Sequence, residues 1–195
     1  MYISSETLIL LLTCYLVGSI PFGLLFSLSL TKNDPRLVGS KNIGATNITR
    51  ISGWKVGLLT LLCDIFKGFL PIFFFKNQLV NIDLMILCIF LGHLFPIWIR
   101  FKGGKGIAVI IGCLLAYEVA FGLLFVTVWL VVAVTTKYSS LSALTASLAS
   151  LALIYLRNEQ FLPVMLIIVC MIFFKHFSNI KRLVNGKETK IVLKK

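Results

Sequence analysis

Acidic residues and histidines are scarce in this sequence of 195 residues, which has seven Asp and Glu together and two His. The histidines stand far apart, at positions 93 and 176, and neither belongs to a spacing typical of metal ligands. The five cysteines lie singly in apolar runs without a CxxC pair, so neither a zinc site nor a disulfide framework is indicated. We therefore expect neither a metal ion nor a cofactor.

Charged residues of both signs are also few. They make up 13% of the chain, whereas roughly a quarter is usual in a soluble domain, and hydrophobic residues make up 58%. The formal net charge of +12 would suggest a nucleic acid partner for a soluble protein, but here the basic residues lie between and after the apolar segments. A water-soluble domain is therefore excluded, and the lipid bilayer, not nucleic acid, is the expected partner.

The apolar segments predict an all-α fold, a polytopic transmembrane helix bundle that occupies residues 1–195 as a single domain. About seven short helices are expected, over residues 7–30, 54–75, 82–99, 107–116, 119–136, 141–156 and 160–174. The fourth has only about 10 residues, against the roughly 17 that cross a bilayer unaided, so five spans remain the alternative. Residues 18–21 predict a kink in the first helix, which is too long for a signal-peptide core and is expected to stay in the mature protein.

The basic residues are unequally divided between the two faces of this bundle. With seven helices, the polar segments on the face of the C-terminus carry 5, 3, 1 and 7 Lys and Arg, while the opposite face carries only Lys76 and Arg157. Because positive loops stay in the cytoplasm, the N-terminus is predicted outside and the C-terminus inside.

The first basic loop, residues 39–50 (GSKNIGATNITR), has the composition of an anion-binding site. Its small residues let backbone N–H groups approach a ligand, Ser40, Asn42 and Asn47 offer hydrogen bonds, and the planar fork of Arg50 suits a phosphate. A glycine-rich turn capped by Ser and Asn before the next helix is equally compatible with these residues.

The second basic loop, residues 100–106 (RFKGGKG), places three cations and three glycines directly before a predicted helix. Lys102, Gly103, Gly104 and Lys105 would form a phosphate cradle there. The loop is not a Walker A motif, because Gly106 stands where Ser or Thr would bind magnesium. The alternative is a cluster of topological charges at the lipid headgroups.

Two further polar segments lie on the same predicted face. One contains Ser142, and the other is the tail with His176 and Asn179, which alone would be a solvated basic extension against anionic lipid. Together with the two loops they would suit a phosphorylated substrate.

Within the second predicted helix, Asp64 and Lys67 share one face and are expected to form a structural ion pair. The alternative places Lys67 among the cations of the site. Neither histidine has the aspartate of a His-x4-Asp acyltransferase pair, and His93 can equally be a helix-end hydrogen-bonding residue.

Three motifs in this chain are similar to those of the PlsY family of bacterial membrane acyltransferases. The family pattern GSxNxGATNxxR resembles residues 39–50, GHxFPxxxxFKGGKG resembles residues 92–106, and DxxKG resembles residues 64–68. Residues 18–21 (GSIP) and 179–183 (NIKRL) also match, so the resemblance covers nearly the whole chain.

The chain departs from the family pattern at three places. Lys41 stands where glycine is common, Val109 where threonine is common, and residues 177–178 (FS) where Arg-Glu is often found. The last departure removes an acidic residue from the tail.

The resemblance implies an enzyme that transfers a fatty acyl group from acyl phosphate to the 1-hydroxyl of glycerol 3-phosphate. The products are lysophosphatidic acid and inorganic phosphate, at the start of phospholipid synthesis. The expected location is a bacterial cell membrane, with the active site facing the cytoplasm. A soluble enzyme that produces acyl phosphate is a candidate partner, and no nucleic acid is expected.

The resemblance also suggests roles for individual residues. The expected catalytic residues are Lys105, Ser40, Arg50, His176 and Asn179. The expected substrate-binding residues are Asn42, Asn47, Lys67, His93, Lys102, Gly103, Gly104 and Ser142. In this hypothesis the glycine-rich loop holds the donor phosphate, the first loop binds glycerol 3-phosphate, and the acyl chain lies in a groove lined by Phe and Leu. The proton of the attacking hydroxyl goes to the departing phosphate, or to His93 or His176 as a general base.

Two other functions are compatible with a chain of this kind. A small transporter or channel for an anionic solute would also have intramembrane charges such as Asp64 and Lys67, although transport sites usually lie near the midplane. A regulatory lipid-binding protein would use the basic residues but would not need the glycine-rich loops.

Overall fold

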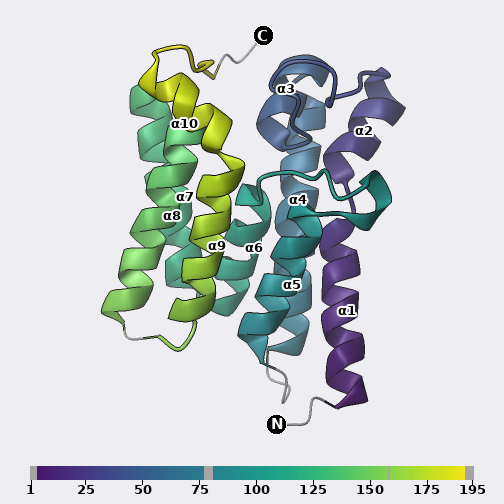
Figure 1. Ribbon diagram of the computed structural model, residues 1–195, viewed down its shortest axis with the longest axis vertical. Helices are drawn as coiled ribbons and strands as arrows, with labels where there is room; N and C mark the ends of the chain where they lie inside the picture. Colours follow the sequence, from purple (N-terminus) through teal and green to yellow (C-terminus); the bar gives the residue numbers. More distant parts are fainter. Residues whose placement is uncertain (1–3, 77–80, 158, 192–195) are drawn as a thin grey trace. The chain divides into compact units, whose positions relative to one another are not determined.

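The computed structural model describes residues 4–76, 81–157 and 159–191. Over these residues the chain is helical and contains no strand (Figure 1), which confirms the predicted all-α fold. Contacts divide the described chain into two compact units, residues 4–117 and 118–191. The expectation of a single domain stays a prediction. Lys194 and Lys195, which were counted in the basic tail, lie outside the described residues.

The first unit contains the helices α1 to α6 (Figure 1). Their bounds are Ser5–Ser19 for α1, Phe22–Thr31 for α2, Ala45–Ser52 for α3, Trp54–Phe75 for α4, Ile82–Leu94 for α5 and Ile107–Tyr117 for α6, with a short 3-10 helix, η1, at Ile97–Ile99. The long apolar helices follow the predicted segments, and α4 begins and ends at the predicted residues. α3 was not predicted, because its eight residues lie in a polar stretch and bury one face only.

The predicted kink in the first helix is a complete break between α1 and α2. Ile20 is extended, with φ −62° and ψ 115°, and Pro21 has no N–H to continue the helical hydrogen bonds. The break leaves the carbonyl group of Ile20 without a helical partner inside an apolar segment. The ammonium group of Lys67 on α4 donates to this oxygen over 2.7 Å.

Close helix packing holds α4 against α6, and α5 fills the centre of the unit. A side chain at Gly68 would collide with the carbonyl oxygen of Val109, and one at Gly112 with that of Ile65, so glycine lets the two backbones touch. α5 packs against α1, α4 and α6. Several of its side chains, such as that of Ile86, have no exposed surface. This packing fixes the end of α5, from which the glycine-rich loop departs.

The second unit contains α7 to α10. Their bounds are Val119–Thr136 for α7, Ser139–Leu156 for α8, Leu162–Lys175 for α9 and Phe177–Val184 for α10. α7 matches its predicted bounds, while α9 and α10 meet at His176 with a bend of 60°. α10 was not predicted, because it is a short amphipathic helix within the basic tail.

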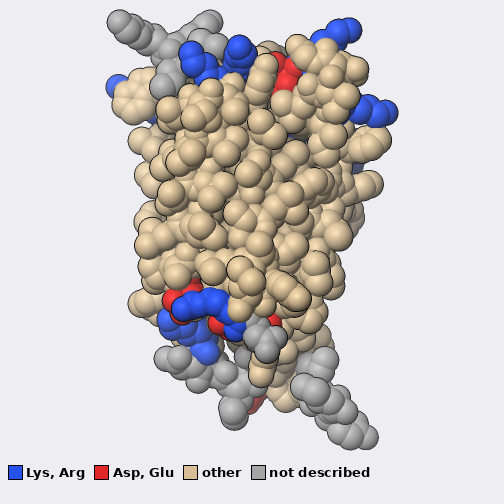
Figure 2. All heavy atoms as spheres, turned by 90° about the vertical axis from the view of Figure 1, so that its left-hand side faces the viewer, with Lys and Arg blue, Asp and Glu red and all other residues tan. Residues whose placement is uncertain are grey.

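By length and apolar composition, five helical segments can cross a membrane. They are residues 5–31, 54–75, 82–99, 119–136 and 139–156, and a sixth results if α9 and α10 form one bent span. α6 has 11 residues, about 16 Å at 1.5 Å per residue, against a hydrocarbon thickness of roughly 30 Å. The structure thus supports the five-span alternative, or six spans, rather than seven full-length spans. On the face shown in Figure 2, the charged side chains of the described residues gather near the two ends of the helices.

Candidate functional site

The first basic loop folds around the side chain of Asn47, in the first turn of α3. This side chain is buried, with 2% of its residue surface exposed. Its carbonyl oxygen accepts a hydrogen bond from the backbone N–H of Ser40 over 2.9 Å. Its amide nitrogen lies within hydrogen-bonding distance of three backbone carbonyl oxygens, those of Pro35 (3.2 Å), Val38 (3.2 Å) and Asn42 (2.8 Å). The loop backbone therefore takes up the hydrogen-bonding capacity of Asn47, which shapes the loop from inside.

Two residues of this loop have left-handed backbone conformations. Gly39 has φ +66° and Lys41 has φ +57°. A side chain at Gly39 would collide with the amide oxygen of Asn47, so only glycine fits there. Lys41 stands where the PlsY family commonly has glycine, and its φ angle explains that preference.

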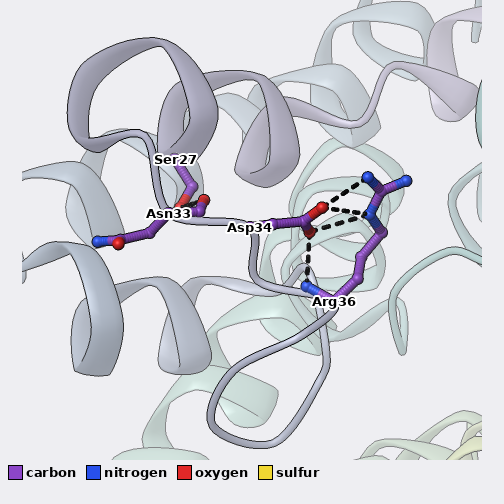
Figure 3. A network of polar contacts seen from close by, with 4 residues as sticks. All are labelled: Ser27, Asn33, Asp34 and Arg36. Carbon is purple, nitrogen blue, oxygen red and sulfur yellow. Dashed lines mark hydrogen bonds and ion pairs between the residues drawn. The ribbon is translucent and has the colours of Figure 1, made fainter.

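The residues that precede the first basic loop are bonded to α2 and to one another (Figure 3). The Ser27 hydroxyl on α2 donates to the carbonyl oxygen of Asn33 over 2.8 Å. Arg36 binds the Asp34 carboxylate through its backbone N–H and its guanidinium, with 2.7 Å between Nη2 and Oδ2. The side-chain hydrogen bond from Arg36 lowers the pKa of Asp34. The charge of Arg36 is therefore already balanced by Asp34.

Three predicted acceptor-site groups have no such partner. The hydroxyl of Ser40, the side-chain amide of Asn42 and the guanidinium of Arg50 make no hydrogen bond or ion pair with another described residue. Ser40 is exposed, and Asn42 and Arg50 are half-buried. The ligand-binding roles of these three side chains stay predictions.

The glycine-rich loop folds back onto the end of α5. The N–H of Gly103 donates to the carbonyl oxygen of Leu94 over 3.2 Å, and the N–H of Gly104 donates to that of His93 over 3.1 Å. These two bonds cap carbonyl groups that the helix end would otherwise leave unpaired. The predicted cradle of glycine amides is therefore altered in one respect: the N–H groups of Gly103 and Gly104 point to the helix, not to a ligand.

Apart from the backbone N–H groups, the positive groups of the glycine-rich loop are two lysine side chains and the helix end that follows them. The ammonium group of Lys102 is exposed and makes no hydrogen bond or ion pair with any described residue, while Lys105 is half-buried. α6 begins at Ile107, and the first N–H groups of a helix have no partner within it and form the positive end of its dipole. Figure 1 shows the two basic loops toward the same end of the first unit.

A buried cluster of ionisable side chains lies below the glycine-rich loop. Nζ of Lys67 is 2.8 Å from Oδ1 of Asp64, and 2% and 3% of these side chains are exposed. The predicted structural ion pair is thus confirmed, and the ammonium group of Lys67 is not placed among the exposed cations. Nδ1 of His93 lies 3.8 Å from the same carboxylate oxygen. The charges that motivated a transporter or channel are thus engaged with each other.

In the second unit, the carboxylate of Glu188 joins α8, α10 and the tail. Oε1 accepts from the Ser140 hydroxyl over 2.8 Å and from the Asn179 amide over 2.6 Å, and Oε2 accepts from Nε of Arg182 over 2.7 Å. Only 7% of the Glu188 side chain is exposed. Burial alone would raise the pKa of Glu188, but the hydrogen bonds from Asn179, Ser140 and Arg182 lower it overall.

Sequence reasoning missed Glu188, which is ten residues from the tail position where the family often has an acid. The available signal was that Glu188 is the one acidic residue among the cations of the tail. Near its end the tail is also bonded to its own unit, because the N–H of Ile191 donates to the carbonyl oxygen of Lys137 over 2.7 Å.

The other two predicted residues of the second unit are buried. The Ser142 hydroxyl donates to the carbonyl oxygen of Tyr138 over 2.8 Å and can still accept a hydrogen bond. Nδ1 of His176 lies 2.8 Å from the carbonyl oxygen of Ile172. Since a carbonyl only accepts, Nδ1 bears the proton, and Nε2 is the basic nitrogen of the neutral ring.

The predicted residues thus form two groups. Ser142, His176 and Asn179 belong to the second unit, and the other ten belong to the first, where they lie on the two basic loops and in the buried cluster. Among the described residues, no group of three or more His, Cys, Asp and Glu side chains could hold a metal ion.

Several apolar helices long enough to cross a membrane define a multi-pass integral membrane protein. A family model described as glycerol-3-phosphate acyltransferase matches residues 8–186. The chain belongs to this family of acyltransferases.

Individual relatives agree with this assignment. The glycerol-3-phosphate acyltransferase of Bartonella quintana (strain Toulouse) is 44% identical over 201 residues, covering 96% of this chain and 95% of the relative. The crystal structure of PlsY (YgiH), an integral membrane glycerol 3-phosphate acyltransferase, in its glycerol 3-phosphate form has a TM-score of 0.91 and 34% identity, with 96% of both chains covered. Its lysophosphatidic acid form has a TM-score of 0.86 and 33% identity, with 95% of both chains covered. The resemblance to the PlsY family is therefore confirmed.

Proposed function

We propose that this enzyme takes its fatty acyl group from acyl phosphate and transfers it to the 1-hydroxyl of glycerol 3-phosphate, releasing lysophosphatidic acid and inorganic phosphate. Acyl transfer to glycerol 3-phosphate is the reaction of its family. One observation supports the phosphate-bearing donor: each of the two basic loops of the first unit offers a cation that no described residue neutralises, Arg50 on one and Lys102 on the other. Two phosphorylated substrates would need two such groups.

The acceptor phosphate is assigned to the first loop. Arg50 can bind a phosphate through two parallel hydrogen bonds, and Ser40 and Asn42 add side-chain donors. Asn47 would not touch the substrate in this proposal, because its polar atoms are bound to the loop backbone. Its role is to hold Ser40 and Asn42 in place.

The donor phosphate is assigned to Lys102, Lys105 and the N-terminal end of α6. As the 1-hydroxyl oxygen attacks the acyl carbon, the bond from that carbon to the phosphate oxygen breaks and negative charge grows on the departing phosphate. Fixed positive groups stabilise this charge more than that of the ground state, which lowers the barrier. An acyl phosphate is a reactive mixed anhydride, so positioning and charge stabilisation suffice without a covalent enzyme intermediate.

The proton of the attacking hydroxyl has two candidate acceptors. One is the departing phosphate itself. The other is a histidine base, His93 or His176; within its own unit His176 has Nε2 as the basic ring nitrogen, because Nδ1 is bonded to the carbonyl oxygen of Ile172. His93 is less suited as a base, since its ring lies directly against Gly104, so a substrate hydroxyl could approach it only if the loop moved.

The acyl chain of the donor is assigned to an apolar pocket of ≈ 400 Å³ in the first unit. It is lined by Ile20, Pro21, Leu24, Leu25, Trp98 and Ile99. Trp98 and Ile99 directly precede the glycine-rich loop, so a chain in this pocket would start close to Lys102. The lining is apolar as expected, although it contains no Phe.

The orientation in a bacterial plasma membrane is proposed from the distribution of charge. The positive-inside rule favours the two basic loops and the tail in the cytoplasm. Phosphorylated substrates, and a soluble enzyme that supplies acyl phosphate, would then reach the site from that side. Single cysteines at positions 41 and 105, in a chain without its native cysteines, should resist an impermeant thiol reagent applied to intact cells. Labelling at either position from outside would show that the chain has the opposite orientation.

The reaction itself is tested with purified protein, acyl phosphate and glycerol 3-phosphate. Equal amounts of lysophosphatidic acid and inorganic phosphate are expected. Glycerol in place of glycerol 3-phosphate should give no product, since the contacts of Arg50 with the acceptor phosphate are then lost. Release of free fatty acid without lysophosphatidic acid would contradict the proposal.

A further inference from the structure

His93 occupies the junction between the last turn of α5 and the glycine-rich loop. Its backbone carbonyl oxygen accepts from the N–H of Gly104 over 3.1 Å. Its ring lies against the same residue from the other side: a side chain at Gly104 would collide with Nε2 and would lie 2.9 Å from Cε1. Gly104 is therefore held by both the backbone and the imidazole of one residue.

The ring of His93 lies next to Asp64 on α4. Nδ1 lies 3.8 Å from Oδ1 of Asp64, and both side chains are buried, at 5% and 3% exposed. The carboxylate is fixed by Lys67 at 2.8 Å, and Lys67 is fixed by the carbonyl oxygen of Ile20 at 2.7 Å. A series of buried contacts thus connects Ile20, in the break between α1 and α2, with His93 beside the glycine-rich loop.

The position of Gly104 determines where the cations of the loop lie. Lys102 and Lys105 flank Gly103 and Gly104, and the N–H groups of both glycines are bonded to the end of α5. A shift of Gly104 would therefore displace the side chain of Lys105 and the start of α6. A displacement of about 1 Å in a positioning group can cost on the order of 100-fold in rate.

We propose that His93, packed next to Asp64, is a positioning residue that fixes the peptide of Gly104 and so sets the geometry of Lys105 toward the substrate phosphate. The expectation that His93 binds substrate is replaced by an indirect role, because a substrate group could reach the buried ring only by moving the loop. This inference rests on the proposed function in one respect, that the loop binds a phosphate.

The direct contact between His93 and Gly104 is tested by enlarging Gly104 with and without the imidazole ring in place. Gly104→Ala should lower kcat, because the added methyl group collides with the imidazole ring. In the background of His93→Ala the same substitution should cause little further loss, because the ring is gone. If Gly104→Ala lowers kcat by the same factor in both backgrounds, the contact does not matter and the proposal is overturned.

The indirect role is tested by a double-mutant cycle with Lys105. His93→Ala should lower kcat by roughly 10-fold, while His93→Gln, which keeps a polar side chain below the loop, should recover part of it. Combined with Lys105→Ala, His93→Ala should add little, since the group that it positions is absent. Independent, multiplying losses would mean that His93 acts only on stability or elsewhere, and would overturn the proposal.

Two controls separate the possible failures. Ile86→Ala removes fully buried volume from the same helix, away from the loop, and should lower the melting temperature but leave kcat per folded molecule unchanged. If Lys105→Ala itself leaves kcat unchanged, the donor-phosphate assignment fails and the positioning role fails with it. If Lys105→Ala lowers kcat but a monodisperse His93→Ala and His93→Gln do not, only the positioning role is wrong.

Discussion

The ammonium group of Lys67 donates a hydrogen bond of 2.7 Å to the carbonyl oxygen of Ile20, in the break between α1 and α2. The break and the intramembrane lysine therefore compensate each other. The carbonyl group of Ile20, which lies at the break, gains a charged donor in addition to the N–H of Phe22, and the lysine gains an acceptor in addition to Asp64 at 2.8 Å.

This relationship predicts a strong loss of stability on removing the lysine alone. Lys67→Ala would leave Asp64 buried without its counter-charge and would remove the charged donor from the carbonyl group of Ile20, at a cost of about 3–5 kcal/mol. The double variant Lys67→Ala with Asp64→Ala should be more stable than Lys67→Ala alone. Melting temperatures in one detergent compare the variants. A double variant less stable than both single variants would contradict the pairing.

A gain in stability is expected from Lys41→Gly. Lys41 has φ +57°, a conformation that costs an L-residue roughly 1–2 kcal/mol, and glycine avoids this cost. Part of the gain is lost because glycine has more conformational entropy in the unfolded chain, so a net increase of about 1 kcal/mol is expected. Thermal unfolding measures it, and a lower melting temperature for Lys41→Gly would contradict the account.

The pH dependence of stability should reveal the buried contacts of Glu188. Because the folded-state pKa of Glu188 is lowered, its stabilising effect is present above the ordinary value of 4.5 and is lost as the pH falls through the folded-state pKa. Glu188→Gln should therefore be less stable than the parent protein at pH 7, with a smaller difference at pH 4. Melting temperatures at the two pH values provide the measurement. A constant difference would show that the Glu188 charge has no role in stability.

Arg50 is expected to act on one substrate only. Arg50→Lys removes the fork of two parallel hydrogen bonds and should raise KM for glycerol 3-phosphate by roughly 10-fold, equivalent to about 1.4 kcal/mol. KM for the acyl phosphate should stay nearly unchanged, and Arg50→Ala should be worse than Arg50→Lys. Steady-state kinetics with each substrate varied in turn decide this. A change confined to the donor KM would remove Arg50 from the acceptor site.

The long helices could be predicted because each is a continuous apolar run bounded by polar residues. α4 and α7 begin and end at the predicted residues, and the break at Pro21 follows from the missing N–H of proline. α3 and α10 could not be predicted in the same way. Each has eight residues in a polar stretch, and their stability depends on packing against their own unit rather than on their composition.

The residue types of the candidate site could be predicted from the sequence, but the contacts between its residues could not. Ser40 and Arg50 could be selected because hydroxyl and guanidinium groups suit phosphate. The internal role of Asn47 depends on hydrogen bonds to the backbone at Pro35 and Val38, which no spacing rule reveals. Glu188 was missed for the same reason, since its partners include Ser140, 48 residues away along the chain.

The central claim, that two phosphate-bearing substrates meet at the two basic loops, is tested most directly by comparing acyl donors. Purified protein is given glycerol 3-phosphate with either acyl phosphate or acyl-CoA of the same chain length, and lysophosphatidic acid is measured over time. The account predicts rapid turnover with acyl phosphate and little or none with acyl-CoA, because the cations of the glycine-rich loop are proposed to bind a small phosphate leaving group. Comparable turnover with acyl-CoA at the same concentration would contradict it.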